Sequence, residues 1–121
     1  MWPSESETTE ISPQAVASLL KSEAAGDGDS FTLVDCREHD EFDICRIDGA
    51  TLIPLSSFVF EAVKSLPDKE QPIIVYCHHG MRSLQATEFL RKKGYGKTFS
   101  MCGGIDAVSY THLTLPTIRM V

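Results

Sequence analysis

The sequence predicts an α/β fold in which a central, mainly parallel sheet carries helices on both faces. Short apolar segments alternate along the chain with longer segments of helical periodicity. The segment 72–76 (PIIVY) is continuously apolar, as is typical of a strand in a parallel sheet that is covered on both faces. The chain has 121 residues, which suits a single compact domain and leaves little room for a second hydrophobic core.

Local signals predict the elements of the first half of the chain. Residues 1–10 are polar and acidic, and we expect a disordered lead-in there. A helix is expected over 11–24, because Ser12 can cap it and Pro13 suits the first helical position. The remaining elements are a buried strand at 31–35 (FTLVD), a short helix or turn at 37–44 and a second strand at 51–53 (TLI).

The second half continues the alternation of helix and strand. Ser56 or Ser57 can cap a helix over 58–66, and a turn-rich break precedes PIIVY, which is the clearest strand of the sequence. An amphipathic helix is predicted over 83–94, with Gly94 ending it. A short strand at 98–101 (TFSM) and a glycine turn that enters a helix at 102–107 complete the pattern.

The charge balance and the apolar runs exclude several classes of partner. The formal net charge of −6 and the pI near 5.1 argue against nucleic acid or an anionic membrane as the main partner. No apolar run approaches the length that crosses a bilayer, and the N-terminus has neither a basic start nor an apolar signal core. We therefore expect a cytoplasmic protein with no nucleic-acid and no membrane partner.

Four cysteines stand far apart, without CxxC spacing and without the density of a disulfide scaffold. In a reducing compartment they are expected to be thiols. They are Cys36, Cys45, Cys77 and Cys102.

The segment 77–83 (CHHGMRS) concentrates reactive and polar residues between the best strand and a helix. Ligands of parallel α/β sheets bind beyond the carboxyl ends of the strands, where Cys77 falls. Gly80 allows the chain to curl, and a curled loop that leads into a helix points its N–H groups at an anion. Arg82 adds a permanent positive charge. Together these features favour the thiolate of Cys77, which is the reactive form of cysteine.

This segment has two other interpretations. A cysteine after a buried strand is commonly just a small apolar side chain. The Cys-His-His run also contains metal ligands, but adjacent residues on one tight loop rarely complete a tetrahedral site, and the sequence offers no second ligand pair. No metal and no other cofactor is therefore expected.

Three motifs in order along the chain carry a family resemblance. The first comprises residues 35–37 (DCR), 41–42 (EF), 47–50 (IDGA) and 53–54 (IP), the second is the Cys77 loop, and the third is 103–107 (GGIDA). In this pattern the chain resembles the rhodanese-like sulfurtransferases, from about residue 10 to residue 107. The resemblance implies a single rhodanese-like domain over residues 11–107.

The resemblance also implies a chemistry. Members of the family form a persulfide on the loop cysteine and pass its outer sulfur to a thiophilic acceptor such as cyanide or another thiol. Cys77 would be the nucleophile and Arg82 would attract a small anionic sulfur donor such as thiosulfate, while the acceptor would be a thiol or a protein. The implied substrate- and anion-binding loop consists of His78, His79, Gly80, Met81, Arg82 and Ser83.

Asp35 and Arg37 match family positions near the crevice. They are possible supporting residues of the site, and an ion pair that fixes the end of a strand is the interpretation we favour for them. The chain departs from many relatives at 45–46, where Cys-Arg replaces Gly-His. Cys36 and Cys102 are either packed, inert thiols or partners that resolve the persulfide as a disulfide.

Two rival functions remain open. Cell-cycle dual-specificity phosphatases are similar in fold, but their loop reads Cys-x5-Arg, whereas Arg82 follows Cys77 after four residues. A nest of that size suits one sulfur atom better than a phosphate. The second rival is a non-catalytic or redox-sensing module on the same fold, against which the presence of the loop cysteine argues.

The segment 108–121 differs from the rest of the chain. Relatives continue after the glycine turn with Trp and a helix, whereas this segment has one charged residue and no clear helical or strand period. Residues 108–117 resemble the in-frame translation of a transposon-end adapter used in DNA library preparation. We therefore expect 108–121 to be a non-native tail.

Overall fold

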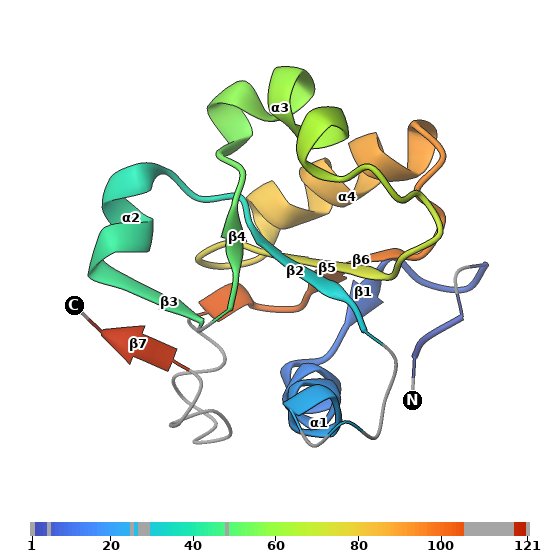
Figure 1. Cartoon of the computed structure of the whole chain (residues 1–121), viewed down its shortest axis with the longest axis horizontal. Coiled ribbons are helices and arrows are strands. Elements are labelled where there is room, and N and C mark those ends of the chain that lie inside the picture. Colours follow the sequence, from blue (N-terminus) through green and yellow to red (C-terminus); the bar gives the residue numbers. More distant parts are fainter. Residues whose placement is uncertain are drawn as a thin grey trace.

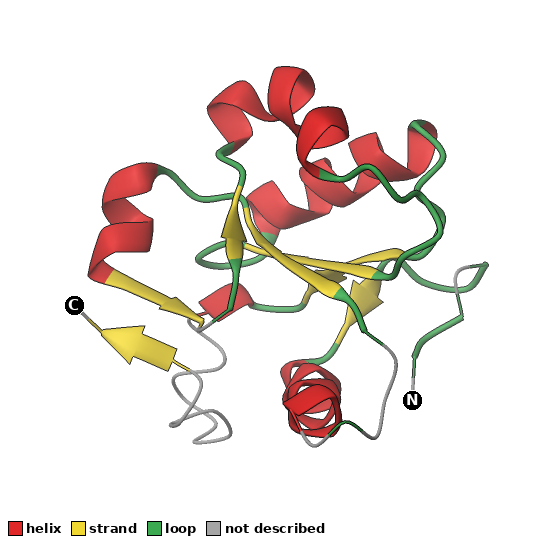
Figure 2. Cartoon of the chain, viewed as in Figure 1, coloured by secondary structure: helices red, strands yellow, loops and turns green. Residues whose placement is uncertain are grey.

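The computed structural model describes residues 2–4, 6–24, 26, 30–47, 49–105 and 118–120 of the chain. A five-stranded sheet forms its centre, with helices on both faces (Figures 1 and 2). All four pairs of neighbouring strands are parallel, in the order β1-β6-β5-β2-β4, which confirms the predicted fold class. The strands are β1 (Glu10–Ile11), β2 (Thr32–Asp35), β4 (Thr51–Leu52), β5 (Ile73–Tyr76) and β6 (Thr98–Met101).

Helices cover the two faces of this sheet unequally. α1 (Pro13–Ala24) packs on one face, and α3 (Phe58–Ser65) and α4 (Met81–Lys92) cover the other, as Figure 1 shows. A 3-10 turn, η1 (Leu55–Ser57), leads into α3, and the short α2 (His39–Ile44) lies at the side of the sheet. No helix in the described part of the chain is long and apolar enough to cross a membrane.

The alternation of side chains along β5 explains the two-sided core. Ile74 and Tyr76 pack with the cluster on the α1 side, which contains Val16 of α1. Val75 and Cys77 pack with the cluster on the opposite side, which contains Ala86 and Leu90 of α4, among others. Successive residues of a strand point to opposite faces, so a strand buried on both faces is apolar throughout. The Cys77 side chain therefore lies on the face of the sheet that α4 covers.

The ends of the helices follow from local chemistry. Ser12 Oγ accepts a hydrogen bond from the Ala15 N–H at 3.1 Å, which confirms the predicted cap of α1. Gly94 has a φ of +101° directly after α4, as expected of a helix-ending glycine. α4 begins at Met81, two residues before the predicted start, because Gly80 (φ +107°) turns the chain straight into the helix.

The N-terminal segment is more structured than expected. β1 pairs with β6 at the edge of the sheet, and the Trp2 ring lies 5.6 Å from the Phe31 ring and 6.0 Å from the Phe99 ring. The expectation of a disordered lead-in over 1–10 is therefore wrong for Trp2 and Glu10. A strand of two residues has no periodicity to detect, and its position depends on pairing with β6, which follows it by almost 90 residues.

A second small sheet was not predicted. β3 (Cys45–Ile47) follows α2 directly and pairs antiparallel with β7 (Ile118–Met120). The residues in which the chain departs from Gly-His thus lie in a strand, and Arg46 donates a hydrogen bond to the Phe42 carbonyl at 3.0 Å. Residues 106–117 and 121 lie outside the described residues. The non-native origin of 108–121 and the course of the helix after the glycine turn therefore stay predictions.

Candidate active site

The candidate site lies at the carboxyl edge of the sheet, where β5 passes into α4. β5 ends at Tyr76, and α4 begins at Met81, so Cys77 and three further residues form the whole connection. Cys77 is 1% exposed, whereas His78 and His79 are exposed. The loop thus holds the thiol inward and presents its imidazoles at the surface.

The Cys77 sulfur is surrounded by hydrogen-bond donors. The Gly80 N–H lies 3.0 Å from Sγ and the Ser83 N–H lies 3.3 Å from it, while Ser83 Oγ lies at 3.5 Å. Both N–H groups belong to the curled loop and the first turn of α4, where no helical carbonyl is available to accept them. These donors converge on the sulfur atom, and the binding of an anionic substrate by this loop stays a prediction.

Electrostatics favour the charged form of this sulfur. The pKa of the Cys77 thiol is lowered to about 4, first by a hydrogen bond from the Cys36 thiol and further by the donors of Ser83 and Gly80, although burial opposes the shift. The pKa of the Cys36 thiol is raised, because its proton is shared with Cys77 and because Cys36 is buried. Cys77 is therefore a thiolate at neutral pH, and Cys36 is its protonated neighbour.

Two glycines set the shape of the loop. Gly80 takes a φ of +107°, which strongly favours glycine. Gly104 has a φ of +64°, and a Cβ there would lie 2.3 Å from the Cys77 carbonyl oxygen. The neighbouring Ile105 N–H donates to that carbonyl at 2.9 Å. The glycine turn after β6 therefore packs against the Cys77 loop and restrains the position of the Cys77 backbone.

A buried pair of hydroxyls continues the network inward. Ser83 Oγ lies 2.7 Å from Ser100 Oγ, and both residues are fully buried. Ser83 Oγ also donates to the Gly80 carbonyl at 3.1 Å. The Cys77 sulfur and the Gly80 carbonyl are both acceptors, and the Ser83 hydroxyl has one proton to donate. Ser83 can donate it to either of them only if Ser100 is the donor in the bond between the two hydroxyls. The sequence offered one signal for Ser100, a small polar residue between Phe99 and Met101 in a predicted strand.

Arg82 forms a bidentate ion pair with Glu41. Its Nη1 and Nη2 atoms lie 2.8 Å and 2.9 Å from the two carboxylate oxygens, and both side chains are about one third exposed. The pair holds the pKa of Glu41 at about 2, mainly through the hydrogen bond from Arg82. Glu41 belongs to α2, so this contact joins α2 to the start of α4. The sequence did not predict Glu41 as a partner of Arg82. The Glu41 carboxylate compensates the positive charge of Arg82.

Asp35 and Arg37 form a buried ion pair at the end of β2. Arg37 Nη2 lies 2.8 Å from Asp35 Oδ2, and the side chains are 0% and 3% exposed. The Arg37 backbone N–H also donates to Asp35 Oδ1 at 2.9 Å, and its guanidinium donates to the Cys45 carbonyl. The structure thus shows the ion pair that the sequence predicts, which ties the end of β2 to β3.

The remaining residues of the loop form its rim. The rings of His78 and His79 meet edge to face with centroids 4.2 Å apart, and Met81 is 73% exposed. Of the two cysteines considered as partners of Cys77, the structure brings Cys36 to it. Cys102 instead lies beside Glu10, and burial raises the pKa of its thiol. All four cysteines are free thiols.

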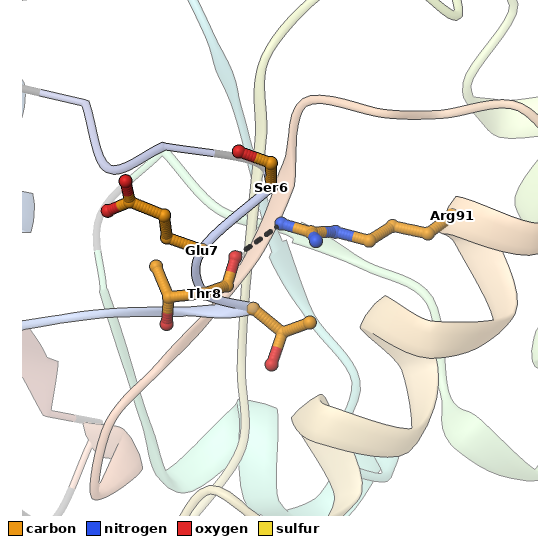
Figure 3. A pocket seen from close by; sticks show the side chains of 5 residues that line it. Ser6, Glu7, Thr8 and Arg91 are labelled. Atoms are coloured by element: carbon orange, nitrogen blue, oxygen red, sulfur yellow. Dashed lines mark hydrogen bonds between the residues drawn. The ribbon is translucent and has the colours of Figure 1, made fainter.

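A separate surface hollow contains none of these residues. It is lined by Ser6, Glu7, Thr8, Thr9 and Arg91 (Figure 3). Arg91 donates hydrogen bonds to the carbonyls of Thr8 and Thr98, each at 2.9 Å. These contacts fasten the N-terminal segment to α4 and β6, so the arginine has a structural role there.

The chain is similar in sequence to known sulfurtransferases. The chain is 33% identical over 108 residues to a thiosulfate sulfurtransferase, GlpE, of Haemophilus influenzae, covering 89% of this chain and 94% of the relative. It is 35% identical over 98 residues to the probable adenylyltransferase/sulfurtransferase MoeZ of Mycobacterium tuberculosis, covering 80% of this chain but 24% of that protein.

Solved structures agree in fold. A rhodanese-like domain from Anabaena superposes with a TM-score of 0.74 at 23% identity, covering 94% of this chain and 80% of that one. A rhodanese-related protein from Thermoplasma volcanium gives 0.67 at 26% identity, covering 86% of this chain and 94% of the other. The family model of the rhodanese-like domain matches residues 12–110. The chain belongs to the rhodanese-like domain family.

Proposed function

We propose that the chain is a rhodanese-type sulfurtransferase, which forms a persulfide on Cys77 from a donor such as thiosulfate and passes that sulfur to a thiophilic acceptor. The observation that carries this proposal is the Cys77 sulfur, which receives two backbone N–H groups from a loop of minimal length. Relatives that share a third of their residues with the chain over nearly their whole length are named thiosulfate sulfurtransferases, which supports the same chemistry.

The first half-reaction needs a thiolate and a stabilised leaving group. The Cys77 thiolate attacks the outer sulfur of thiosulfate, the sulfur–sulfur bond of the donor breaks, and sulfite leaves with the bonding pair. The outer sulfur of the resulting persulfide carries a negative charge near neutral pH. Donors that hold the Cys77 sulfur also hold negative charge in this loop, so the nest favours the loaded enzyme.

In the second half-reaction the acceptor attacks the outer sulfur. Cyanide takes it as thiocyanate, and a thiolate takes it as a new persulfide, while the bonding pair returns to Cys77 as a thiolate. The low pKa of Cys77 makes it a good leaving group in this step. His78, His79 and Met81 form the exposed rim that the donor and the acceptor would meet.

Arg82 has a more limited role than the sequence suggested. Because Glu41 compensates its charge, Arg82 attracts an anionic donor only weakly unless that pair opens or bends toward the donor. The four free thiols suit a reducing compartment, and we propose the cytoplasm as the site of the reaction.

The direct test is the mass of the peptide that contains Cys77 after incubation with thiosulfate. We expect the peptide to gain one sulfur atom, and cyanide to remove it as thiocyanate. Cys77→Ser should abolish both, because a hydroxyl fills nearly the same space but is not a thiolate at neutral pH and cannot hold a persulfide.

Cys45→Ser is the matched control, because Cys45 lies in β3 and its loss leaves the Cys77 loop intact. Transfer of sulfur from thiosulfate to cyanide that survived Cys77→Ser would overturn the proposal. Hydrolysis of an aryl phosphate that stopped with the same change would favour the phosphatase instead.

A further inference from the structure

Cys36 and Cys77 occupy equivalent places on neighbouring strands. β2 and β5 are paired in parallel with Asp35 opposite Tyr76, and each cysteine is the next residue of its strand. The ladder extends to this level, because the Cys36 N–H donates to the Tyr76 carbonyl at 3.0 Å. Paired strands lie about 4.8 Å apart. Disulfides join Cα atoms that are about 4.4–6.8 Å apart, so the backbone spacing suits a bond between these residues.

The two side chains also share one face of the sheet. Both belong to the apolar cluster beneath α3 and α4, and they are 0% and 1% exposed. The Cys36 thiol donates a hydrogen bond to the Cys77 sulfur. The two thiols therefore lie on the same face of two neighbouring, paired strands.

We propose that Cys36 is the resolving thiol of an oxidised Cys77, so that the two residues form a reversible disulfide redox couple. This goes beyond sulfur transfer, because it gives Cys36 a reaction of its own. It rests on the proposed function in one respect: a site that admits thiosulfate also admits hydrogen peroxide, which is smaller and uncharged.

The oxidant is a hydroperoxide, and the chemistry balances in two steps. The Cys77 thiolate attacks one oxygen of hydrogen peroxide, the O–O bond breaks, and hydroxide leaves and is protonated, which yields a sulfenic acid and water. The Cys36 sulfur then attacks the Cys77 sulfur, the S–O bond breaks, and the hydroxyl leaves as water with the Cys36 proton. Two thiols and one peroxide thus give one disulfide and two waters.

The negative charge beside Cys36 is lost during this reaction. While Cys77 is a thiolate, its negative charge and its hydrogen bond hold the proton on Cys36 and keep that thiol inert. Oxidation to the sulfenic acid removes this charge and provides a hydroxyl that can take the proton. Cys36 therefore becomes a nucleophile only when Cys77 is oxidised.

The expected consequence is protection of Cys77. A sulfenic acid that no thiol captures is oxidised further to sulfinic acid, which thiols do not reduce. A disulfide with Cys36 ends oxidation at a state that thiols do reduce. Cys36→Ser keeps a hydrogen-bond donor beside Cys77 but cannot form the bond, whereas Cys36→Ala removes both the donor and the sulfur.

The test treats the reduced full chain with an excess of hydrogen peroxide, because a sulfinic acid consumes two molecules of peroxide, and maps its peptides by mass. Wild-type protein should yield a cross-linked pair of peptides containing Cys36 and Cys77, and dithiothreitol should separate them and restore both thiols. Cys36→Ser and Cys36→Ala should both give Cys77 sulfinic acid that dithiothreitol does not reverse. Cys45→Ser and Cys102→Ser should behave like the wild type.

Over-oxidised Cys77 with a free Cys36 thiol in the wild-type protein would overturn the inference, as would a cross-link to Cys45 or Cys102. Loading of the reduced protein with thiosulfate separates this result from the proposed function. If the protein takes up sulfur from thiosulfate but forms no disulfide, the proposed sulfur transfer stands and the redox couple is overturned. If it forms the disulfide but takes up no sulfur, the redox couple stands and the proposed transfer is overturned.

Discussion

At the level of single residues, the property that matters at Cys77 is the negative charge on sulfur. A thiol with an ordinary pKa gains about tenfold in reactivity per pH unit up to about pH 8.5, as its thiolate fraction grows. The pKa of Cys77 is about 4, so its thiolate is complete above about pH 5 and is lost only as the pH falls through 4.

We therefore expect the rate of Cys77 alkylation by iodoacetamide to change little between about pH 5 and about pH 8. The rate is measured from the mass of the Cys77 peptide, which separates it from the other three thiols. The Cys102 thiol, whose pKa is raised by burial, serves as the internal control and should react only at high pH. An alkylation rate for Cys77 that rose steadily from pH 6 to pH 9 would contradict the lowered pKa.

Ser100 acts on the same sulfur through Ser83. Ser100→Ala removes the hydroxyl that donates to Ser83, and a Ser83 hydroxyl that no longer accepts a hydrogen bond is a weaker donor to Cys77. The pKa of Cys77 should therefore rise, by less than one unit if the weakening is below about 1 kcal/mol. Ser100→Thr keeps the hydroxyl and should restore the wild-type profile. The same alkylation series measures both variants, and an unchanged profile in Ser100→Ala would show that Ser100 only fills space.

At the level of elements, the ion pair between Arg82 and Glu41 joins α2 to α4 and also lies beside the site. Arg82→Ala should raise the KM for thiosulfate at low salt, because it leaves the Glu41 carboxylate uncompensated near an anionic donor. Glu41→Gln should lower that KM, because it frees the charge of Arg82. Both effects should shrink as salt rises, and both variants should lose less than about 1 kcal/mol of stability, since the pair is partly exposed.

Steady-state kinetics at two salt concentrations, with urea unfolding of each variant, decides this point. Opposite signs of the two KM changes would show that charge is what matters. Equal increases in KM in both variants, insensitive to salt, would mean that the pair only holds α2 against α4.

The elements that could be predicted are those whose sequence carries its own signal. The continuously apolar segment PIIVY predicts β5, and Ser12 and Pro13 predict the start of α1. β1, β3 and β7 have two or three residues each, too few for a period, and their pairing depends on segments distant in the sequence.

The same division applies to the site. The loop from Cys77 to Ser83 is contiguous, so its curl and its donors could be predicted from its residues. Glu41 and Ser100 reach the site from α2 and β6, and their contacts depend on packing and register that no local pattern encodes. The contact of Cys36 with Cys77 likewise requires the pairing of β2 with β5.

At the level of the whole molecule, the chain gathers its three motifs at the carboxyl edge of one parallel sheet. The ion pair of Asp35 and Arg37 lies at the end of β2, the Cys77 loop follows β5, and Gly104 follows β6. Parallel strands end at the same edge, which is why motifs far apart in sequence meet there. β2, β5 and β6 are neighbours in the sheet, so this assembly depends on the five-stranded core.

The segment after residue 107 should therefore be dispensable for the chemistry. Truncation after Ala107 removes β7, which in the described part of the chain pairs with the three-residue β3 in a two-stranded sheet of its own. A two-stranded sheet of this length contributes little stability alone. Sulfur transfer should persist and the melting temperature should change little.

Adding a Trp and an amphipathic helix after Ala107 should raise the melting temperature, because buried apolar surface contributes about 25 cal/mol per Å². Thermal unfolding of the three proteins measures this, and a truncated chain that failed to fold would show that 108–121 is integral to the domain.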